Sequence, residues 1–263
     1  AALDIFIKLN DKKKIASVYN NLGNIFEKQG NYKQALEHHL KSLKLKEELG
    51  DTLAMASSYN NIGIVLKYEG NFEKALEYYN KSLEINIKAN KKKSIAQSYT
   101  NIGGVYQQMI QSNYYRDSLF TKEELYDICI DNYFKALEMS EKEDNKVGEA
   151  IALNNIASIF FMMGKYNAAL DYNLQALSLR EKIGDRSGVS GTMANLGQVY
   201  LKLNKKDEAK SYISESLKIA LEIGAKDRIK TSYRIVSEID SALGNYKDAY
   251  LNYKFYTMYQ DSL

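Results

Sequence analysis

A short motif that returns at a fixed spacing constrains this chain more than any other feature. "YNNIG" occupies Tyr59–Gly63, and the related "YNNLG" and "YTNIG" end at Gly23 and Gly103, so the three motifs are 40 residues apart. The same spacing later separates three alanines, Ala169, Ala209 and Ala249. A period of roughly 20–50 residues is the signature of a repeat architecture, in which each unit buries its apolar face against its neighbours.

Each unit predicts two helices. "LAMASSYNNIGIVLKYEG" has apolar residues at helical spacing, Gly70 and Asn71 then favour a turn, and "FEKALEYYNKSLEINIKAN" follows. The chain has no Pro, which favours uninterrupted helices. We therefore expect an all-α fold of about six helix-turn-helix repeats within one solenoid over 1–263. The predicted units are 12–50, 51–90, 91–145, 146–184, 185–224 and 225–263, and 1–11 reads as the tail of a preceding repeat.

The third unit carries an insertion near 110–124, because Gly103 and its counterpart Ala157 are 54 residues apart instead of 40. The segment contains Tyr114, Tyr115 and Phe120, and "TKEE" then predicts a helix start at which Thr121 caps toward Glu124. Two interpretations are open. The insertion lengthens two helices and their loop, or it folds over a binding surface or contacts another protein.

Composition excludes several classes of protein. With 45% hydrophobic and 26% charged residues the chain is expected to fold, and no apolar run approaches the ~18 residues of a membrane span. A net charge of +3 is too small to indicate nucleic-acid binding. The single Cys excludes an internal disulfide framework and a cysteine zinc site. The compartment is not indicated; a cytoplasmic location is favoured, with a periplasmic one as the alternative if a signal segment was removed.

The order of residue types within a unit resembles the tetratricopeptide repeat. In the second unit it reads Tyr59, Ile62, Gly63, Leu66, Ala75, Tyr79 and Ser82. The other units follow this order, and the last is degenerate. The resemblance implies a right-handed superhelix with a concave inner groove. Two departures, a period of 40 instead of the common ~34 and the absence of a closing Pro, are expected to reflect a lengthened second helix. In this the chain resembles kinesin light chains, spindle-orientation adaptors and the repeat regions of bacterial sensor kinases and peptide-sensing regulators.

Small residues recur at two positions of each unit. We expect Gly63 and Ala75, with their counterparts, to lie where two helix backbones pass closely, while Tyr and Leu fill the remaining gaps.

The Asn residues of the motif call for a different explanation, because Asn in a helix interior costs roughly 0.5–0.7 kcal/mol relative to Ala. At about 100° per residue, Tyr59, Ile62 and Gly63 share one arc of the helix, and Asn60 and Asn61 fall outside it. A core amide would lie inside that arc. The second of the two Asn positions of the motif is Asn in all five units that carry it: Asn21, Asn61, Asn101, Asn155 and Asn195. The first position varies, and it is Asn at Asn20, Asn60 and Asn154.

In tetratricopeptide superhelices this sector lines the inner groove, and the column resembles the asparagine ladder of O-GlcNAc transferase and kinesin light chain. The resemblance implies that the amides bind the backbone of an extended peptide. The alternatives are a structural bridge between adjacent repeats and a feature without present use. Neighbouring groove positions would supply specificity, with polar residues first and apolar ones later: Lys67, Tyr68, Gln107, Phe161 and Met162.

Catalytic chemistry is not indicated. His38 and His39 are adjacent, so they point about 100° apart, unlike the i, i+4 pair of a helical zinc site. Cys129 stands where four other units have Ala and reads as a small buried residue. We expect no enzyme activity, no cofactor and no metal.

The function that these features favour is a scaffold for a protein or peptide, in the sensory or regulatory part of a larger signalling protein. The last predicted helix, "YLNYKFYTMYQDSL", is aromatic nearly all round, so another helix or a second chain is expected to cover it. The alternative function is accordingly an oligomerisation module, in which this helix and the insertion mediate self-association as a homodimer.

Overall fold

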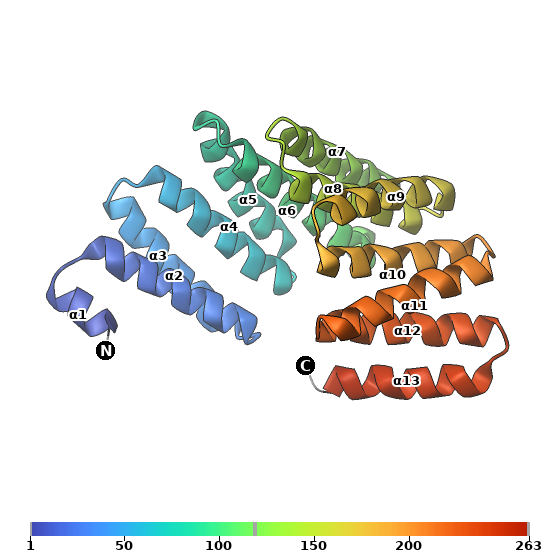
Figure 1. The fold of residues 1–263 in the computed structure, drawn as a ribbon. Helices are drawn as coiled ribbons and strands as arrows, with labels where there is room; N and C mark the ends of the chain where they lie inside the picture. The colour runs from blue at the N-terminus through green and yellow to red at the C-terminus, as the bar shows by residue number, and fades with distance from the viewer. Residues whose placement is uncertain (1, 118–119, 262–263) are drawn as a thin grey trace. The chain divides into compact units, whose positions relative to one another are not determined.

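The computed structural model describes residues 2–117 and 120–261, and this part of the chain consists of helices without strands. The helices are drawn in Figure 1. Their bounds are α1 (Ala2–Lys8), α2 (Lys12–Lys28), α3 (Tyr32–Glu48), α4 (Thr52–Tyr68), α5 (Phe72–Lys88), α6 (Lys92–Gln111), the 3-10 helix η1 (Tyr114–Asp117), α7 (Lys122–Glu141), α8 (Lys146–Met162), α9 (Tyr166–Lys182), α10 (Arg186–Lys202), α11 (Lys206–Glu222), α12 (Lys226–Ala242) and α13 (Tyr246–Asp261). The pairs from α2/α3 to α12/α13 are the six predicted helix pairs.

The 40-residue period consists of two equal halves. The first and second helices of a regular unit, such as α4 and α5, both have 17 residues, so the second helix is no longer than the first. Three residues connect one regular helix to the next, both within a repeat and between repeats. The middle residue of the three has a positive φ, which Gly and Asn tolerate best. These middle residues are Asn10, Gly30, Gly50, Gly70, Asn90, Gly164, Gly184, Asn204, Gly224 and Gly244.

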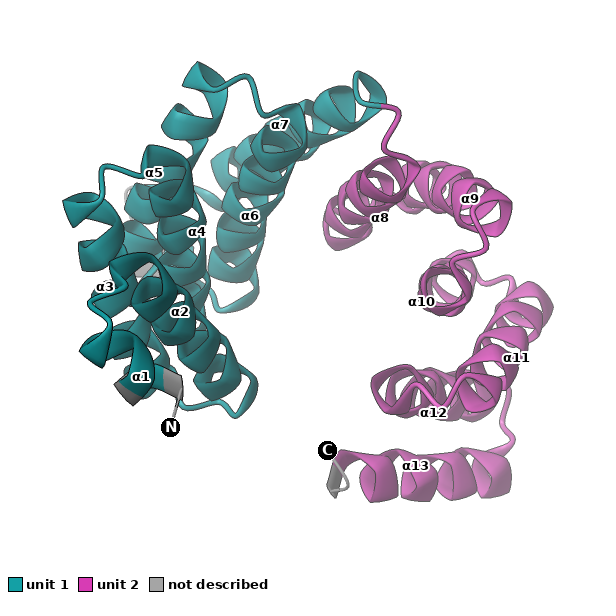
Figure 2. Ribbon diagram, turned by 60° about the vertical axis from the view of Figure 1, so that its left-hand side comes forward, with its two compact units in different colours: residues 1–143 teal, residues 144–263 magenta. Residues whose placement is uncertain are grey.

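The chain divides into two compact units, Ala1–Glu143 and Asp144–Leu263, coloured separately in Figure 2. Within the first unit each helix from α2 to α6 packs against the next one along the chain, and α6 packs on α7. First helices also contact each other, as α2 with α4 and α4 with α6. The second unit repeats this arrangement from α8 to α13. A single array over 1–263 remains a prediction.

The small residues of the first helices accommodate side chains of the second helices. A Cβ atom built on Gly63 would lie 2.8 Å from the ring of Tyr79, and one on Gly103 would lie 2.7 Å from that of Tyr133. At these positions a buried ring therefore covers the glycine, and the close passage of two backbones expected there stays a prediction. At Gly197 a backbone atom is among the nearest neighbours, with the carbonyl oxygen of Ala209 3.3 Å from such a Cβ.

The insertion lengthens both helices of its unit and their connection. α6 and α7 have 20 residues each, and Thr121 forms the predicted capping box with Glu124 at the start of α7. The Tyr114 hydroxyl donates to Glu73 Oε1 at 2.6 Å, and its ring meets Phe72 edge to face. The described part of the insertion thus contacts the start of α5, a second helix. Residues 118 and 119 lie outside the described residues.

Candidate functional site

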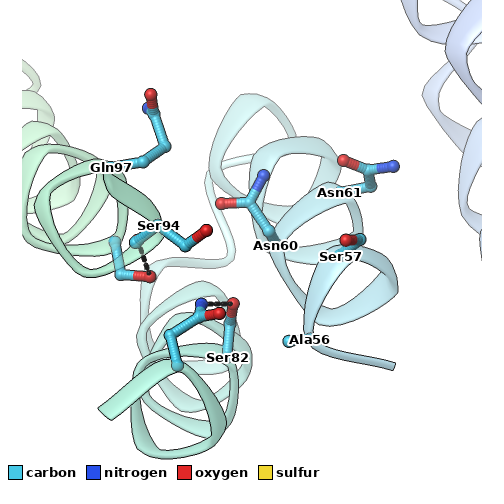
Figure 3. A pocket seen from close by; sticks show the side chains of 9 residues that line it. Ala56, Ser57, Asn60, Asn61, Ser82, Ser94 and Gln97 are labelled. Carbon is cyan, nitrogen blue, oxygen red and sulfur yellow. Dashed lines mark hydrogen bonds between the residues drawn. The ribbon is translucent and has the colours of Figure 1, made fainter. Parts of the chain in front are cut away.

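A polar pocket of about 240 Å³ lies where α4, α5 and α6 meet (Figure 3). Six of its nine lining residues carry a hydroxyl or amide beside the two predicted asparagines Asn60 and Asn61. They are Ser57 from α4, Ser82 and Asn86 from α5, and Ser94, Gln97 and Ser98 from α6. No acidic or basic side chain lines this pocket, so its lining offers neutral donors and acceptors only.

Asparagines of adjacent repeats are hydrogen-bonded to each other. Asn61 Nδ2 donates to Asn20 Oδ1 at 3.0 Å, and Asn101 Nδ2 donates to Asn60 Oδ1 at 2.6 Å. Each bond joins the second Asn of one repeat to the first Asn of the repeat before it. The face of α2, α4 and α6 that carries these four residues is called the ladder face below. The structural bridge considered for these residues is therefore present in the first unit.

The bridging bonds use only part of the hydrogen-bonding capacity of each amide. An Asn side chain has two N–H donors and an acceptor oxygen. Within the described residues, Asn60 accepts without donating, and Asn61 donates without accepting. Both are half-buried, and Figure 3 shows their side chains on opposite sides of α4. Donors and acceptors therefore remain available beside the pocket.

The second unit has a different pattern on the corresponding face of α8 and α10. Asn154 Nδ2 donates to Asn173 Oδ1 at 3.0 Å, and its own Oδ1 accepts from the Thr192 hydroxyl at 2.8 Å. Asn155 and Asn195 are half-buried and make no hydrogen bond among the described residues, and neither does the exposed Asn21 of the first unit.

The predicted apolar positions also lie on this face. Phe161 and Asn195 line a small pocket of about 50 Å³, together with Gln198 and others. Phe161 packs against Tyr166 with ring centres 5.5 Å apart, and Met162 is half-buried.

The remaining predicted groove residues have well-defined environments. Lys67 is half-buried with its Nζ 5.0 Å from the ring centre of the exposed Tyr68, and burial lowers the pKa of Lys67 although the Glu27 carboxylate opposes this. Burial likewise raises the pKa of Glu27 against the effect of Lys67. Gln107 Oε1 accepts from the Tyr133 hydroxyl at 2.7 Å.

Sequence reasoning missed the contribution of the second helix to the pocket. Ser82 and Asn86 are four residues apart on α5, hence on one face of the helix, and Asn86 Nδ2 donates to Ser82 Oγ at 3.3 Å. A buried Asn and Ser at this spacing, amid the apolar residues of a second helix, are the signal that could have revealed the pocket. Asn86 does not belong to the repeated order of residue types, and Ser82 stands there only as a small residue, so the repeat pattern alone does not indicate the pocket.

The two histidines and the cysteine are packing residues here. The His38 ring stacks on Phe26 with ring centres 5.2 Å apart, and His39 is fully buried against Gly23. Cys129 is buried, with its Sγ 3.4 Å from the Gly103 carbonyl oxygen. In the described part of the chain no three His, Cys, Asp or Glu side chains group as metal ligands, and no helix is long and apolar enough to cross a membrane.

Family models described as tetratricopeptide repeat match residues 1–48, 14–88, 52–111, 118–182 and 191–222. The chain belongs to the tetratricopeptide repeat family. Together with the helix pairs, this membership makes the fold an all-α tetratricopeptide solenoid. No curated protein matches the sequence.

Several solved tetratricopeptide-like structures share the fold. The apo form of RapI is 17% identical with a TM-score of 0.74, over 98% of this chain and 87% of that chain. A Rap protein complexed with competence and sporulation factor is 16% identical with a TM-score of 0.68, over 93% and 74%. A putative kinesin light chain from Podosopora anserina is 11% identical with a TM-score of 0.62, over 81% and 98%. At these identities the likeness concerns the fold.

Proposed function

We propose that this tetratricopeptide chain is a protein-interaction scaffold, and that its asparagines bind the backbone of an extended peptide. The observation that carries the proposal is that the side-chain amides of these asparagines use only part of their hydrogen-bonding capacity. Asn60 keeps its donors and Asn61 its acceptor at the rim of a neutral polar pocket, and Asn155 and Asn195 have no hydrogen-bond partner among the described residues. A peptide backbone offers one donor and one acceptor per residue, which matches such amides.

The inter-repeat bonds support this function and do not compete with it. Because Asn101 and Asn60 hold each other, the remaining polar atoms of both side chains keep fixed positions before a ligand arrives. Preorganisation of this kind lowers the entropy cost of binding. One of the structural neighbours was solved with a bound factor, the Rap protein complexed with competence and sporulation factor, which is compatible with a binding role for the fold. We further propose that the chain serves as the sensory or regulatory part of a signalling protein.

Selection from a random peptide library against the whole chain, followed by affinity measurement on the selected peptides, tests the proposal. Asn155→Ala and Asn195→Ala are the most informative changes, because neither removes a hydrogen bond within the described residues. Each lost hydrogen bond to the peptide corresponds to roughly 0.5–1.5 kcal/mol, so we expect affinity to fall about threefold to tenfold per variant.

Asn80→Ala is the matched control, because Asn80 is an exposed Asn of helix α5 without a hydrogen bond among the described residues. It should bind every selected peptide as the unchanged chain does. Circular dichroism should show the same helix content in all three variants. If the Asn155 and Asn195 variants bind like the control, the asparagines do not hold the peptide and the proposal is wrong.

Self-association through α13 is a second candidate function, favoured by the exposed apolar side chains of that helix. Tyr246 is 72% exposed and Tyr250 63%, and Tyr253, Phe255 and Met258 are also exposed. Such a patch marks an interaction surface in many soluble proteins. A homodimer through α13 would appear in sedimentation equilibrium, and Tyr250→Ser should then shift the chain toward monomer. A monomer at high concentration would exclude this role.

A further inference from the structure

Two arginines from different helices lie over the glycines of one turn of α10. The Arg180 guanidinium, from α9, occupies the space that a Cβ on Gly188 would need, with its Cζ 2.7 Å from that position. The Arg228 guanidinium, from α12, covers Gly191, with Nη1 2.8 Å from the corresponding Cβ position. Residues three apart on a helix have Cβ positions roughly 5–6 Å apart. The two guanidinium groups therefore converge on one short stretch of backbone.

The repeat register relates these arginines to the polar pocket of the first unit. Arg180 stands in its repeat where Asn86 stands in the second repeat, and Gly188 and Arg228 both correspond to Ser94. Asn86 and Ser94 both line the polar pocket between α4, α5 and α6. Arg180 and Arg228 therefore place cationic groups at register positions where the residues of the polar pocket are neutral.

The positive charge at this place is only partly compensated. Arg180 is 11% exposed, and its hydrogen bond is a long one, from Nη1 to Asp185 Oδ2 at 3.4 Å. Its Nε is buried and has no hydrogen-bond partner in the described part of the chain. Asp185 is shared, since its other oxygen accepts from the Gly188 N–H at 2.8 Å. Arg228 is exposed and makes no hydrogen bond or ion pair among the described residues.

A buried guanidinium with unused donors is costly, and an anion that accepts from it removes that cost. Burial lowers the pKa of Arg180, and the nearby Arg228 adds to this shift against the effect of Asp185. The neighbouring Arg186 differs, because its guanidinium is paired with Glu222. The charge of Arg180 is thus only partly compensated, and Arg228 has no ion pair among the described residues, whereas Arg186 is paired.

We propose that Arg180 and Arg228 form a subsite for the carboxylate of an Asp or Glu side chain in a bound peptide. A planar carboxylate can accept bidentate hydrogen bonds from guanidinium groups, and the N-terminal turn of α10 adds a favourable dipole. The subsite rests on the proposed peptide-binding function and adds its specificity, because the asparagines contact backbone and do not select a sequence.

The test is the same peptide-library selection, carried out in parallel on the unchanged chain, on Arg228→Gln and on Arg186→Gln. The unchanged chain should enrich Asp or Glu at one fixed position of the selected peptides. Arg228→Gln should still select peptides but without that enrichment. Arg186→Gln removes the same charge from an exposed arginine paired with Glu222 and should keep the enrichment.

A double-mutant cycle then measures the contact. For one selected peptide, replacing its acidic residue by Gln or Asn should weaken binding to the unchanged chain at least tenfold, and the same replacement should have almost no effect on binding to Arg228→Gln. Arg180→Lys keeps the charge but not the planar fork and should reduce the preference.

The outcomes separate the two proposals. If peptides are selected but their acidic residues do not depend on Arg228, the subsite is wrong while the binding function stands. If the unchanged chain selects no peptide, the proposed function fails and the subsite fails with it.

Discussion

The residue that packs beneath the first-helix glycine differs between repeats, and this difference has consequences for stability. Tyr79 and Tyr133 cover Gly63 and Gly103, whereas His39 covers Gly23, with its Cε1 2.5 Å from a Cβ built there. His39 is fully buried, and neither ring nitrogen has a hydrogen-bond partner among the described residues. Burial lowers the pKa of His39 to about 4, and the positive charge of Lys46 contributes to the shift.

Acid should therefore destabilise the first unit through His39. Its folded pKa of about 4 lies below the ordinary 6.5, so the unfolded chain binds the proton more readily. The stabilising contribution of the neutral ring is present above about pH 6.5 and is lost as pH falls toward 4. Replacing His39 by Tyr, the residue at the same place in the next repeat, should remove up to about 3 kcal/mol of this pH dependence. Urea unfolding at pH 7 and pH 4.5 measures the free energy of unfolding of the unchanged chain and of His39→Tyr. If both lose the same free energy between the two pH values, the explanation is contradicted.

Neighbouring glycines in α6 should respond oppositely to alanine. A Cβ on Gly103 would press on the buried Tyr133 ring, so Gly103→Ala should lower the free energy of unfolding by roughly 1–3 kcal/mol. A Cβ on Gly104 would meet only the Tyr133 hydroxyl at 3.9 Å, so Gly104→Ala should raise it by up to about 1 kcal/mol through helix propensity. Thermal or urea unfolding compares the two variants. The same sign for both would show that packing against Tyr133 does not determine the choice of glycine.

The helices and turns form a module of 20 residues, in which one turn residue must adopt a positive φ. Asn204 has φ 60° where the equivalent turn before α10 has Gly184 with φ 69°. Asn204→Gly should therefore stabilise the second unit by a few tenths of a kcal/mol, and Gly184→Ala should destabilise it by about 1 kcal/mol. Differential scanning calorimetry measures both changes. A stabilising Gly184→Ala would contradict the role given to this turn.

Helix positions were predictable because the signals are local. The predicted starts of the pairs, such as Asp51 and Asp185, are the N-cap residues of α4 and α10. The angular argument likewise placed Asn60 and Asn61 away from the fully buried face. The equal lengths of the two helices were not predicted, because the resemblance suggested a longer second helix.

Across the whole chain, the features that depend on three helices at once were beyond sequence reasoning. The polar pocket combines Ser57, Asn86 and Gln97 from α4, α5 and α6, and the proposed carboxylate subsite combines Arg180 with Arg228 over α10. None of these residues belongs to the repeated motif. The hydrogen bond from Asn61 to Asn20 could not be predicted from the sequence either, because it depends on how closely adjacent repeats pack. The repeated residues therefore determine the helical scaffold, and residues outside the repeated motif make the surfaces of the two units different.

The central claim is that the asparagines hold a peptide by its backbone, and an N-methyl scan of a selected peptide tests it most directly. Methylating one backbone nitrogen at a time removes a donor and leaves every side chain unchanged. We predict that methylation at a few positions weakens binding to the unchanged chain about tenfold, and that the effect at one of them disappears in Asn155→Ala or Asn195→Ala. If the chain tolerates methylation at every position while side-chain replacements abolish binding, the backbone-holding function of the asparagines is contradicted.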